Sequence, residues 1–408
     1  MRPNILNLWL HGEHLGEVEH LRNGSNRLRF TADSVKRWGN GTYLLSYSLP
    51  LTSRRIESPA LEAYLDNLLP EGALRTQLEQ KYRIRPGDVF GLLTHLGSEC
   101  AGAVQLTPED VPPTGHLVDL SDSEVNQIVG DLPTLAPPAG QTVTASLGGV
   151  QSKVLLTRTD RGWAWPAAGA MSTHLVKPEP ADPHAPIPRL IEYEHWTMHL
   201  AAQCGIPTAR TDLTRFGDRL ALVVERYDRA DGRRLHQEDF AQALGIRPGL
   251  KYEPGGPAAA QQASRLKRIA MGPGAETDDP RAFRTSLLRL VTFNLLIGNG
   301  DAHAKNYSLL LQDGTFSLAP AYDLTPVYHI NNQYDDFGLS VGGQRHLRYL
   351  AARHLIAEAQ SWGMSELAAR DTIAHMAEAL VVALDVVPVT PLVEPLAQAI
   401  ARRTTAFG

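Results

Sequence analysis

Two aspartates and an asparagine near residue 300 have the types and spacing that phosphoryl transfer needs. Asp301 and Asn306 are separated by four residues, and Asp323 follows two short runs in which apolar and polar residues alternate. In this chemistry one carboxylate accepts the proton of the attacking hydroxyl, while the asparagine and the later aspartate hold Mg²⁺ on the phosphates. The pattern therefore predicts Asp301 as a general base and Asn306 and Asp323 as metal ligands.

A β-hairpin would bring Asp323 back to the loop that carries Asp301. The runs YSLLL and TFSLA are joined by Asp313-Gly314, and Asp-Gly is a strong signal for a two-residue hairpin turn. A turn centred on this pair places Asp323 opposite residue 304, within about 5 Å across the strands. We expect the two carboxylates and the amide to converge there, because such oxygen ligands suit Mg²⁺.

The same segment departs from the usual protein-kinase pattern. Asn299-Gly300-Asp301 stands where kinases have His-Arg-Asp, and Tyr322-Asp323-Leu324 replaces Asp-Phe-Gly. The chain also lacks the G-x-G-x-x-G loop of those enzymes. Because an isolated Asp-x₄-Asn spacing also occurs in surface turns, the hairpin and the second aspartate are what favour a catalytic site.

A pair of glycines followed by a lysine is typical of a loop that binds phosphate. The run is Ser146-Leu147-Gly148-Gly149-Val150-Gln151-Ser152-Lys153, and it leads into the strand-like segment VLLTR. Adjacent glycines let backbone N–H groups approach a phosphate closely, and the lysine adds positive charge. The run is not a Walker A motif, and an ordinary turn before a strand is the alternative.

Two further segments could complete a nucleotide site. Lys177 lies in the strand-like run HLVKP, where a lysine could reach phosphate oxygens. The apolar run LALVVE breaks into the polar cluster Glu225-Arg226-Tyr227, which would suit a hinge whose backbone binds adenine. Glu192 or Glu194, on the helix predicted after Lys177, could pair with that lysine. A surface lysine and a salt-bridged strand end are the alternatives.

The composition is that of an ordinary globular protein. The 408 residues predict two or three domains, and 43% of them are apolar. The net charge of −5 gives no bulk attraction to DNA, so any DNA contact must come from a local patch or from a partner. The two cysteines cannot form a disulfide framework. Because no segment resembles a signal peptide or a membrane span, we expect a cytoplasmic protein with no membrane association.

Hydrophobic periodicity predicts sheets mainly in the first half of the chain and helices mainly in the second. The Pro-rich stretch 107–140 is a candidate boundary made of surface loops. The run 281–299 is apolar on nearly every side, so we expect a buried helix there. The other expected elements are β-structure over 1–50, helices over 58–82 (broken at Pro70), 191–205 and 351–406, and strands over 153–158, 162–166, 173–178 and 220–229.

Taken together and in this order, the motifs resemble the HipA family of bacterial Ser/Thr kinase toxins. They are SLGGVQSK, HLVKP, ERYDR, HQEDFAQALG, KYEPGGP, GDAHAKN and APAYDLTP, with LLPEG and LGSECAGAVQL nearer the N-terminus. The resemblance covers nearly the whole chain. It implies an α+β, protein-kinase-like fold with an N-terminal α/β part and an all-α C-terminal lobe. The implied domains are an N-terminal subdomain over 1–107, a kinase-like small lobe over 108–227 and a mainly helical lobe over 228–408.

The resemblance also assigns roles to residues. It implies Asp301 as the catalytic base, with Asn306 and Asp323 as the Mg²⁺ ligands. Ser146 matches the serine that such kinases autophosphorylate to silence themselves. An ATP site is implied that consists of a phosphate loop, a phosphate-binding lysine, a hinge and two further contacts: Gly148, Gly149, Val150, Gln151, Ser152, Lys153, Lys177, Glu225, Arg226, Tyr227, His303 and Tyr322.

The family further implies partners. A small HipB-like helix-turn-helix antitoxin would bind the chain, and operator DNA would be contacted mainly through it, which would associate the complex with the nucleoid. The protein substrate would belong to the translation machinery, such as an aminoacyl-tRNA synthetase. Two other functions stay open on the residues alone: a catalytically silent kinase-like corepressor, and a metal-dependent phosphohydrolase that uses the Asp301-Ala-His303 pair.

Overall fold

The computed structural model describes residues 3–143, 151–182, 185–255 and 262–407. The chain forms two compact units, each with its own packed interior. The first unit consists of residues 1–178, 212–248 and 310–314, and the second of residues 179–211, 249–309 and 315–408. This division by packing does not follow the three-domain boundaries expected from the resemblance, which stay a prediction.

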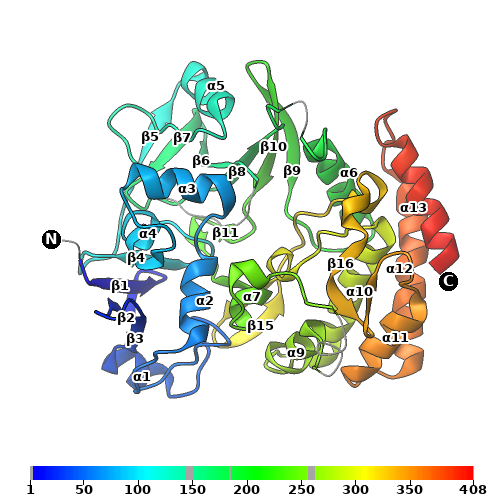
Figure 1. The fold of residues 1–408 in the computed structure, drawn as a ribbon, viewed down its shortest axis with the longest axis horizontal. Helices are drawn as coiled ribbons and strands as arrows, with labels where there is room; N and C mark the ends of the chain where they lie inside the picture. Colours follow the sequence, from blue (N-terminus) through cyan, green and yellow to red (C-terminus); the bar gives the residue numbers. More distant parts are fainter. Residues whose placement is uncertain (1–2, 144–150, 183–184, 256–261, 408) are drawn as a thin grey trace. The chain divides into compact units, whose positions relative to one another are not determined.

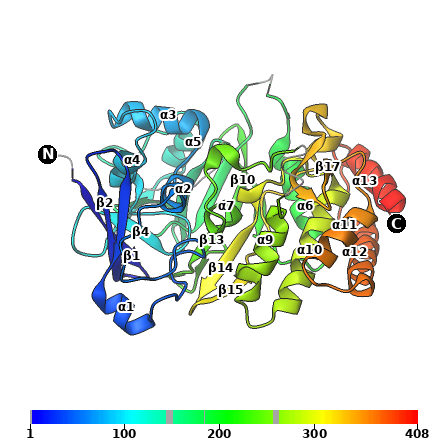
Figure 2. The same cartoon turned by 60° about the horizontal axis from the view of Figure 1, so that its bottom comes forward.

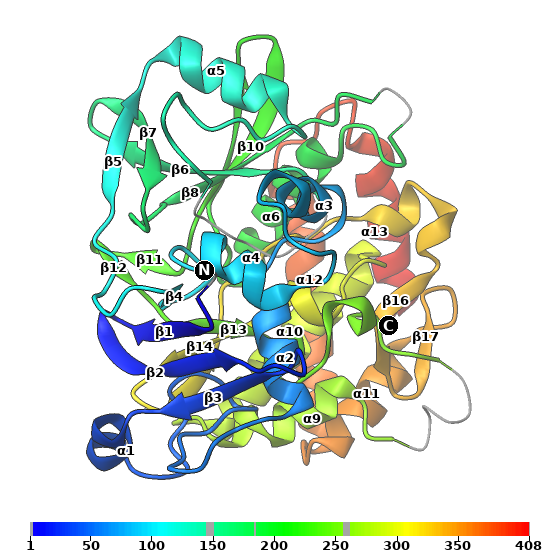
Figure 3. The same cartoon turned by 60° about the vertical axis from the view of Figure 1, so that its left-hand side comes forward.

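The first unit begins with a four-stranded antiparallel sheet in the order β3-β2-β1-β4, whose blue strands lie side by side in Figure 3. Strand β1 has five consecutive buried residues, and β4 is buried throughout, so both contribute to the core. Helix α2 contacts β3, and α4 contacts β4. The elements are β1 (Ile5–Leu10), β2 (Glu13–His20), β3 (Asn26–Phe30), α1 (Ala32–Trp38), α2 (Pro59–Asn67), α3 (Gly72–Lys81), α4 (Val89–Leu96) and β4 (Val104–Thr107).

A six-stranded sheet follows in the first unit, in the order β5-β7-β6-β8-β10-β9 (Figure 1). In it β7 pairs antiparallel with β5 and β6, β8 pairs antiparallel with β6 and β10, and helix α5 packs against β5 and β8. Central strand β8 is therefore flanked by β6 and β10. The elements are β5 (His116–Leu120), α5 (Asp122–Asp131), β6 (Val154–Thr159), β7 (Gly162–Ala167), β8 (His174–Pro178), β9 (Thr211–Phe216), β10 (Arg219–Glu225), β11 (Arg229–Ala230), β12 (Arg233–Arg234), β13 (Gln237–Asp239) and α7 (Phe240–Ala243).

The second unit is mainly helical and is built around α10, which contacts α9, α11, α12 and α13 (Figure 2). Helix α12 also packs against α6. Strand β14 (Ser308–Gln312) begins in this unit and leads into the hairpin turn. The other elements are α6 (Leu190–Gln203), α9 (Arg265–Met271), α10 (Pro280–Ile297), β15 (Thr315–Leu318), β16 (Asp336–Val341), β17 (Gln344–His346), α11 (Ala352–Ser361), α12 (Glu366–Val386) and α13 (Glu394–Phe407).

Several expectations are confirmed and others are wrong. The buried helix, the break at Pro70 and the helical C-terminal segment are all present. Residues 43–50, expected as a strand, form turns with one isolated bridge between Ser46 and Leu49. The stretch 107–140 holds β5 and α5 as well as loops, and Ser121 begins α5 with a capping box. Among the described residues no helix is long and apolar enough to cross a membrane.

Candidate functional site

Helix α10 leads the chain into the loop that carries the predicted base. Asp279 caps its first turn by accepting hydrogen bonds from the N–H groups of Arg281 and Ala282, at 3.0 and 2.9 Å. Every residue of the helix from Leu290 onward is buried. The helix ends at Gly298, whose φ of +73° is the left-handed conformation that glycine adopts without strain. The loop after it therefore begins from a fixed point in the core.

The loop holds Asp301 and Asn306 together through its own hydrogen bonds. The Asn306 side-chain N–H₂ donates to the Asp301 carbonyl at 3.1 Å, and the His303 N–H donates to the same carbonyl at 2.7 Å. Asn306 is buried, whereas Asp301 is partly exposed. Because the amide nitrogen is the donor, the amide oxygen of Asn306 is left as a ligand for a hard cation.

Strand β16 supports this loop by an unusually close approach. A Cβ atom at Gly338 would lie 2.5 Å from the Ala302 carbonyl oxygen and 2.6 Å from the His303 nitrogen. Only glycine fits at that distance, so Gly338 lets the two backbones touch. Sequence reasoning missed this residue, because the contact joins segments with no pattern in common.

The predicted hairpin is confirmed, and its register agrees with the expected one. Asp313 and Gly314 form the turn with φ of +50° and +82°, as a type I′ turn requires. The Ala319 N–H donates to the Ser308 carbonyl at 2.9 Å. At the open end the Tyr322 hydroxyl donates to the Lys305 carbonyl at 2.8 Å. The side chain of Tyr322 thus closes the hairpin, and its predicted contact with nucleotide stays a prediction.

The backbone at Asp323 is fixed by hydrogen bonds to its own carbonyl and to the carbonyl of the next residue. Its φ of +57° is uncommon for a residue other than glycine, although aspartate tolerates it. The Asn299 side-chain N–H₂ donates to the Asp323 carbonyl at 3.4 Å, and the Thr197 hydroxyl donates to the Leu324 carbonyl. The backbone is therefore fixed at the residue whose carboxylate is the second predicted Mg²⁺ ligand. Its hard oxygen donors, with the Asn306 amide oxygen, fit that ion.

His303 is a neutral residue of the loop. Burial, with the positive charges of Lys251 and Lys305 adding to it, lowers the pKa of His303 to about 3. Its Nδ1 is buried and has no hydrogen-bond partner among the described residues. The ring lies edge-on to Tyr252, with centroids 5.0 Å apart. An uncharged ring with an open nitrogen is compatible with the nucleotide contact predicted for His303, which is not tested.

In the first unit Lys177 is buried on the central strand β8, at 8% exposure, and is paired with Leu222 of β10. Strands β6 and β8 pair Val154 with Val176. Continuing that register by one residue brings Lys153 opposite Lys177. Two lysines on facing positions concentrate positive charge at one place in the sheet, which is compatible with the phosphate contacts predicted for both; those contacts are not tested.

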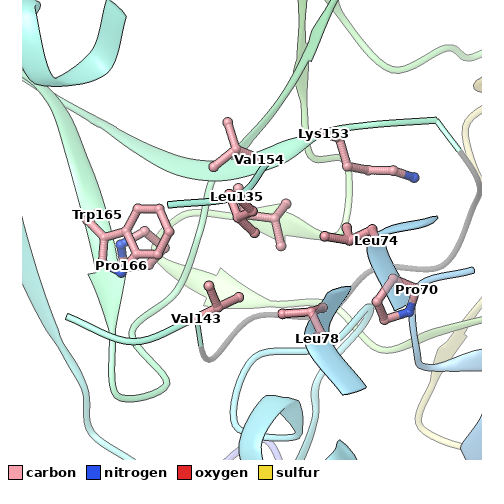
Figure 4. Close-up of a pocket in the computed structure, with 10 residues that line it drawn as sticks. Pro70, Leu74, Leu78, Leu135, Val143, Lys153, Val154, Trp165 and Pro166 are labelled. Atoms are coloured by element: carbon pink, nitrogen blue, oxygen red, sulfur yellow. The ribbon is translucent and has the colours of Figure 1, made fainter. Parts of the chain in front are cut away.

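Lys153 also borders a small apolar pocket of about 30 Å³ within the first unit (Figure 4). Leu74 and Leu78 of α3 line one side of it, and Val154 and Trp165 line another. The Lys153 ammonium group points away from Trp165 in this view. The volume is about that of one water molecule, too small to hold a ligand. The pocket is therefore a packing gap beside Lys153.

The predicted hinge divides into residues with different surroundings. Glu225 is exposed at the end of β10, and the Tyr227 hydroxyl donates to the side chain of Gln237. Arg226 is 5% exposed, and its guanidinium donates to Asp228, to Ser172 and to Glu99, at 2.7–3.1 Å. Its side chain is thus occupied inside the unit, and a nucleotide contact by residues 225–227 stays a prediction.

Other predicted residues are only partly described. Ser146, Gly148, Gly149 and Val150 lie outside the described residues, whereas Gln151, Ser152 and Lys153 lie within them and are half-buried. In the second unit Glu192 is bonded by the Arg189 guanidinium, and Glu194 is 2% exposed. Across the described ranges no group of three or more His, Cys, Asp or Glu side chains could hold a metal ion, but one carboxylate and one amide, as predicted for Mg²⁺, would not form such a group.

Comparisons with known proteins cover nearly the whole chain. Residues 145–384 match the model described as HipA-like C-terminal domain, and residues 6–107 match the HipA N-terminal domain. A Sinorhizobium fredii protein named Putative kinase Y4mE is 37% identical over 79% of this chain and 77% of its own length. The Serine/threonine-protein kinase toxin HipA of Shewanella oneidensis is 30% identical over 79% of this chain and 76% of its length.

A solved structure agrees with these matches. The complex of HipA, HipB and operator DNA from Shewanella oneidensis MR-1 contains a chain that superposes with a TM-score of 0.79 and 27% identity, covering 98% of this chain and 96% of that one. The expected mixed α+β, kinase-like fold is confirmed by this match. The expected class of enzyme is confirmed as well, since the relatives are named as kinases.

Proposed function

We propose that this chain, which belongs to the HipA family, is a Ser/Thr protein kinase that transfers the γ-phosphate of ATP to a protein hydroxyl. The observation that carries the proposal is the loop of the second unit. In this loop the Asn306 side chain donates a hydrogen bond directly to the Asp301 carbonyl. After the hairpin, the Tyr322 hydroxyl donates to the Lys305 carbonyl, and Asp323 is the next residue along the chain. These are the base and the two oxygen ligands that phosphoryl transfer requires.

In the proposed step Asp301 removes the proton of the substrate hydroxyl. The O–H bond breaks, the proton bonds to the carboxylate, and the hydroxyl oxygen bonds to the γ-phosphorus. The bond from the γ-phosphorus to the β–γ bridging oxygen breaks, and ADP leaves. Partial exposure of Asp301 is compatible with this role, because the protein substrate must reach it from solvent.

Asn306 and Asp323 would hold Mg²⁺, and Lys177 and Lys153 would hold phosphates. Bound Mg²⁺ would neutralise charge on the β- and γ-phosphates. Support for the lysines is the strand register, in which positions 153 and 177 face each other across β6 and β8. ATP and Mg²⁺ are therefore the proposed nucleotide substrate and metal ion.

The proposal extends to regulation and partners. Ser146 would be autophosphorylated. Its phosphate would then compete with the phosphates of ATP for the loop Gly148–Lys153, because two negatively charged groups repel each other at one binding site. The solved complex of the Shewanella relative contains HipB and operator DNA, and this supports a HipB-like antitoxin for the present chain. The proposed cellular role is that of a cytoplasmic toxin that phosphorylates a translation component, such as an aminoacyl-tRNA synthetase.

The test is incubation with ATP labelled in the γ-phosphate, with Mg²⁺, alone and with cell lysate. The proposal expects label on Ser or Thr residues of protein, with intact mass spectrometry and phosphosite mapping finding a phosphate on Ser146. Release of free phosphate without protein-bound label would instead indicate a phosphohydrolase. Absence of both reactions, with ATP binding intact, would indicate a silent corepressor.

A further inference from the structure

A tyrosine from a distant segment contacts the predicted base directly. The Tyr252 hydroxyl donates a hydrogen bond to Oδ1 of Asp301, although the two residues are 49 positions apart. Its ring lies edge-on to His303 of the same loop, at an interplanar angle of 84°. All three residues belong to the second unit. One oxygen of the Asp301 carboxylate is therefore already occupied by a phenol.

The chain before Tyr252 is anchored to the catalytic loop. The Arg265 guanidinium donates to the Leu250 and Lys251 carbonyls, both at 2.7 Å. The Lys251 carbonyl also accepts a hydrogen bond from the Ala304 N–H at 3.1 Å. Ala304 lies only three residues after Asp301, so this bond fixes the backbone beside Tyr252 to the loop itself.

The chain after Tyr252 is anchored to β16. The Glu253 N–H donates to the Gly338 carbonyl at 2.9 Å, and the buried Glu253 carboxylate accepts from the Ser340 N–H at 2.9 Å. The same carboxylate accepts from the Arg265 N–H at 3.1 Å. The residues on both sides of Tyr252 are thus held by hydrogen bonds, while 43% of the surface of Tyr252 itself is exposed.

We propose that Tyr252 is the positioning residue of Asp301: its hydroxyl holds Oδ1, so that Oδ2 is the oxygen that accepts the substrate proton. The inference rests on the proposed function, because it needs Asp301 to be the base. A second interpretation is that the phenol occupies the place of the substrate hydroxyl and turns away about its Cα–Cβ bond when substrate binds. It predicts that Tyr252→Phe is as active as the wild type or more active.

Tyr252 remains a proton donor throughout. Burial, followed by the Asp301 carboxylate, raises the pKa of Tyr252 well above its ordinary value. At neutral pH the phenol therefore keeps its proton, and only the proton of the substrate moves, from the substrate oxygen to Oδ2. The geometry of the carboxylate then stays the same from one turnover to the next.

The substitution Tyr252→Phe removes the hydroxyl and keeps the ring against His303. We expect kcat to fall about 10- to 100-fold, the cost of a misplaced reacting group. KM and the calorimetric Kd for Mg-ATP should stay within about twofold, because the variant leaves the ligands untouched. Tyr349→Phe is the matched control: Tyr349 is 57% exposed and lies edge-on to His346, at 85° and 6.0 Å. Its kcat should equal that of the wild type.

The same assay in an Asp301→Asn background separates this inference from the proposed function. If Asp301 is the base, Asp301→Asn alone lowers transfer about 10²–10⁴-fold while ATP still binds, and adding Tyr252→Phe costs nothing more. Equal transfer by the wild type and Asp301→Asn would refute the proposed function. Loss of transfer in Asp301→Asn together with normal or faster kcat in Tyr252→Phe would leave the function standing and overturn the positioning role. A raised Kd for Mg-ATP in Tyr252→Phe would also overturn it.

Discussion

At the scale of single residues, two predicted site aspartates of the second unit are positioned through their own backbone carbonyls. Asp301 and Asp323 each offer their carbonyl to a side-chain amide, from Asn306 and Asn299. The backbone beneath both carboxylates is thereby fixed. This arrangement explains how a loop outside regular strands and long helices can hold groups in the orientation that catalysis requires.

The first prediction concerns Asp323, the second proposed Mg²⁺ ligand. Asp323→Asn keeps an oxygen ligand and tolerates the positive φ, but it removes a negative charge. We expect Mg²⁺-dependent ATP binding to weaken on the order of 10-fold or more, because ligand charge sets the affinity for a hard cation. Titration calorimetry at several Mg²⁺ concentrations measures this effect.

Asp301→Asn is the matched control for that titration, since it makes the same chemical change at the proposed base and should leave binding unchanged. Lys177→Met should raise KM for ATP at every Mg²⁺ concentration, since the role proposed for this lysine is to bind phosphate and not the metal. Equal metal-dependent affinity in Asp323→Asn and the wild type would contradict the assignment of Asp323.

At the scale of elements, the hairpin and α10 could be predicted because their signals are local. The Asp-Gly turn and the apolar run each depend on neighbours in sequence. The contacts that join distant elements could not be predicted. The Arg226 guanidinium meets Glu99, 127 positions away, and Tyr252 meets Asp301. Which buried charge meets which partner is decided by packing, and a single sequence contains no period or spacing that reports it.

A buried carboxyl that links β13 to a turn of the first unit leads to a prediction about how stability depends on pH. Glu238 of β13 is fully buried and accepts from the Ser46 hydroxyl and the Tyr47 N–H. Burial raises the pKa of Glu238 from 4.5 to about 8. Between these values the folded protein binds a proton that the unfolded chain releases, so the free energy of unfolding falls as pH rises through that window.

Glu238→Gln should reduce the fall in the free energy of unfolding as pH rises through this window. Relative to the wild type, the variant should gain stability on the order of a few kcal/mol between pH 5 and pH 9, measured as the difference in thermal or denaturant midpoints. Glu378→Gln, at an exposed position of α12, is the control and should follow the wild-type curve. An identical decline in Glu238→Gln and the wild type would show that Glu238 is not the group responsible.

At the scale of the whole molecule, the sequence predicted the family correctly because its motifs recur in order along nearly the entire chain. The two family models together match residues 6–107 and 145–384. The division into two packed units could not be predicted in the same way. The first unit draws on residues 1–178, 212–248 and 310–314, and segments so far apart leave no boundary in composition or loop length.

The net charge of the whole chain leads to a prediction about DNA binding. With a net charge of −5, the chain alone should not shift operator DNA at physiological salt, because non-specific affinity depends on neutralising phosphates. With the proposed HipB-like antitoxin it should appear in the shifted complex. An electrophoretic mobility assay with both proteins, singly and together, checks this. A specific shift by the chain alone would contradict a partner-borne contact.

The role of Asp301 as the base is tested by measuring γ-phosphate transfer by Asp301→Asn beside Asp313→Asn. Both variants exchange a carboxylate for an amide, but Asp313 is an exposed residue of the hairpin turn, and asparagine also adopts its positive φ. We expect Asp301→Asn still to bind Mg-ATP while its transfer falls about 10²–10⁴-fold, and Asp313→Asn to be fully active. Near-normal transfer by Asp301→Asn would show that Asp301 is not the base.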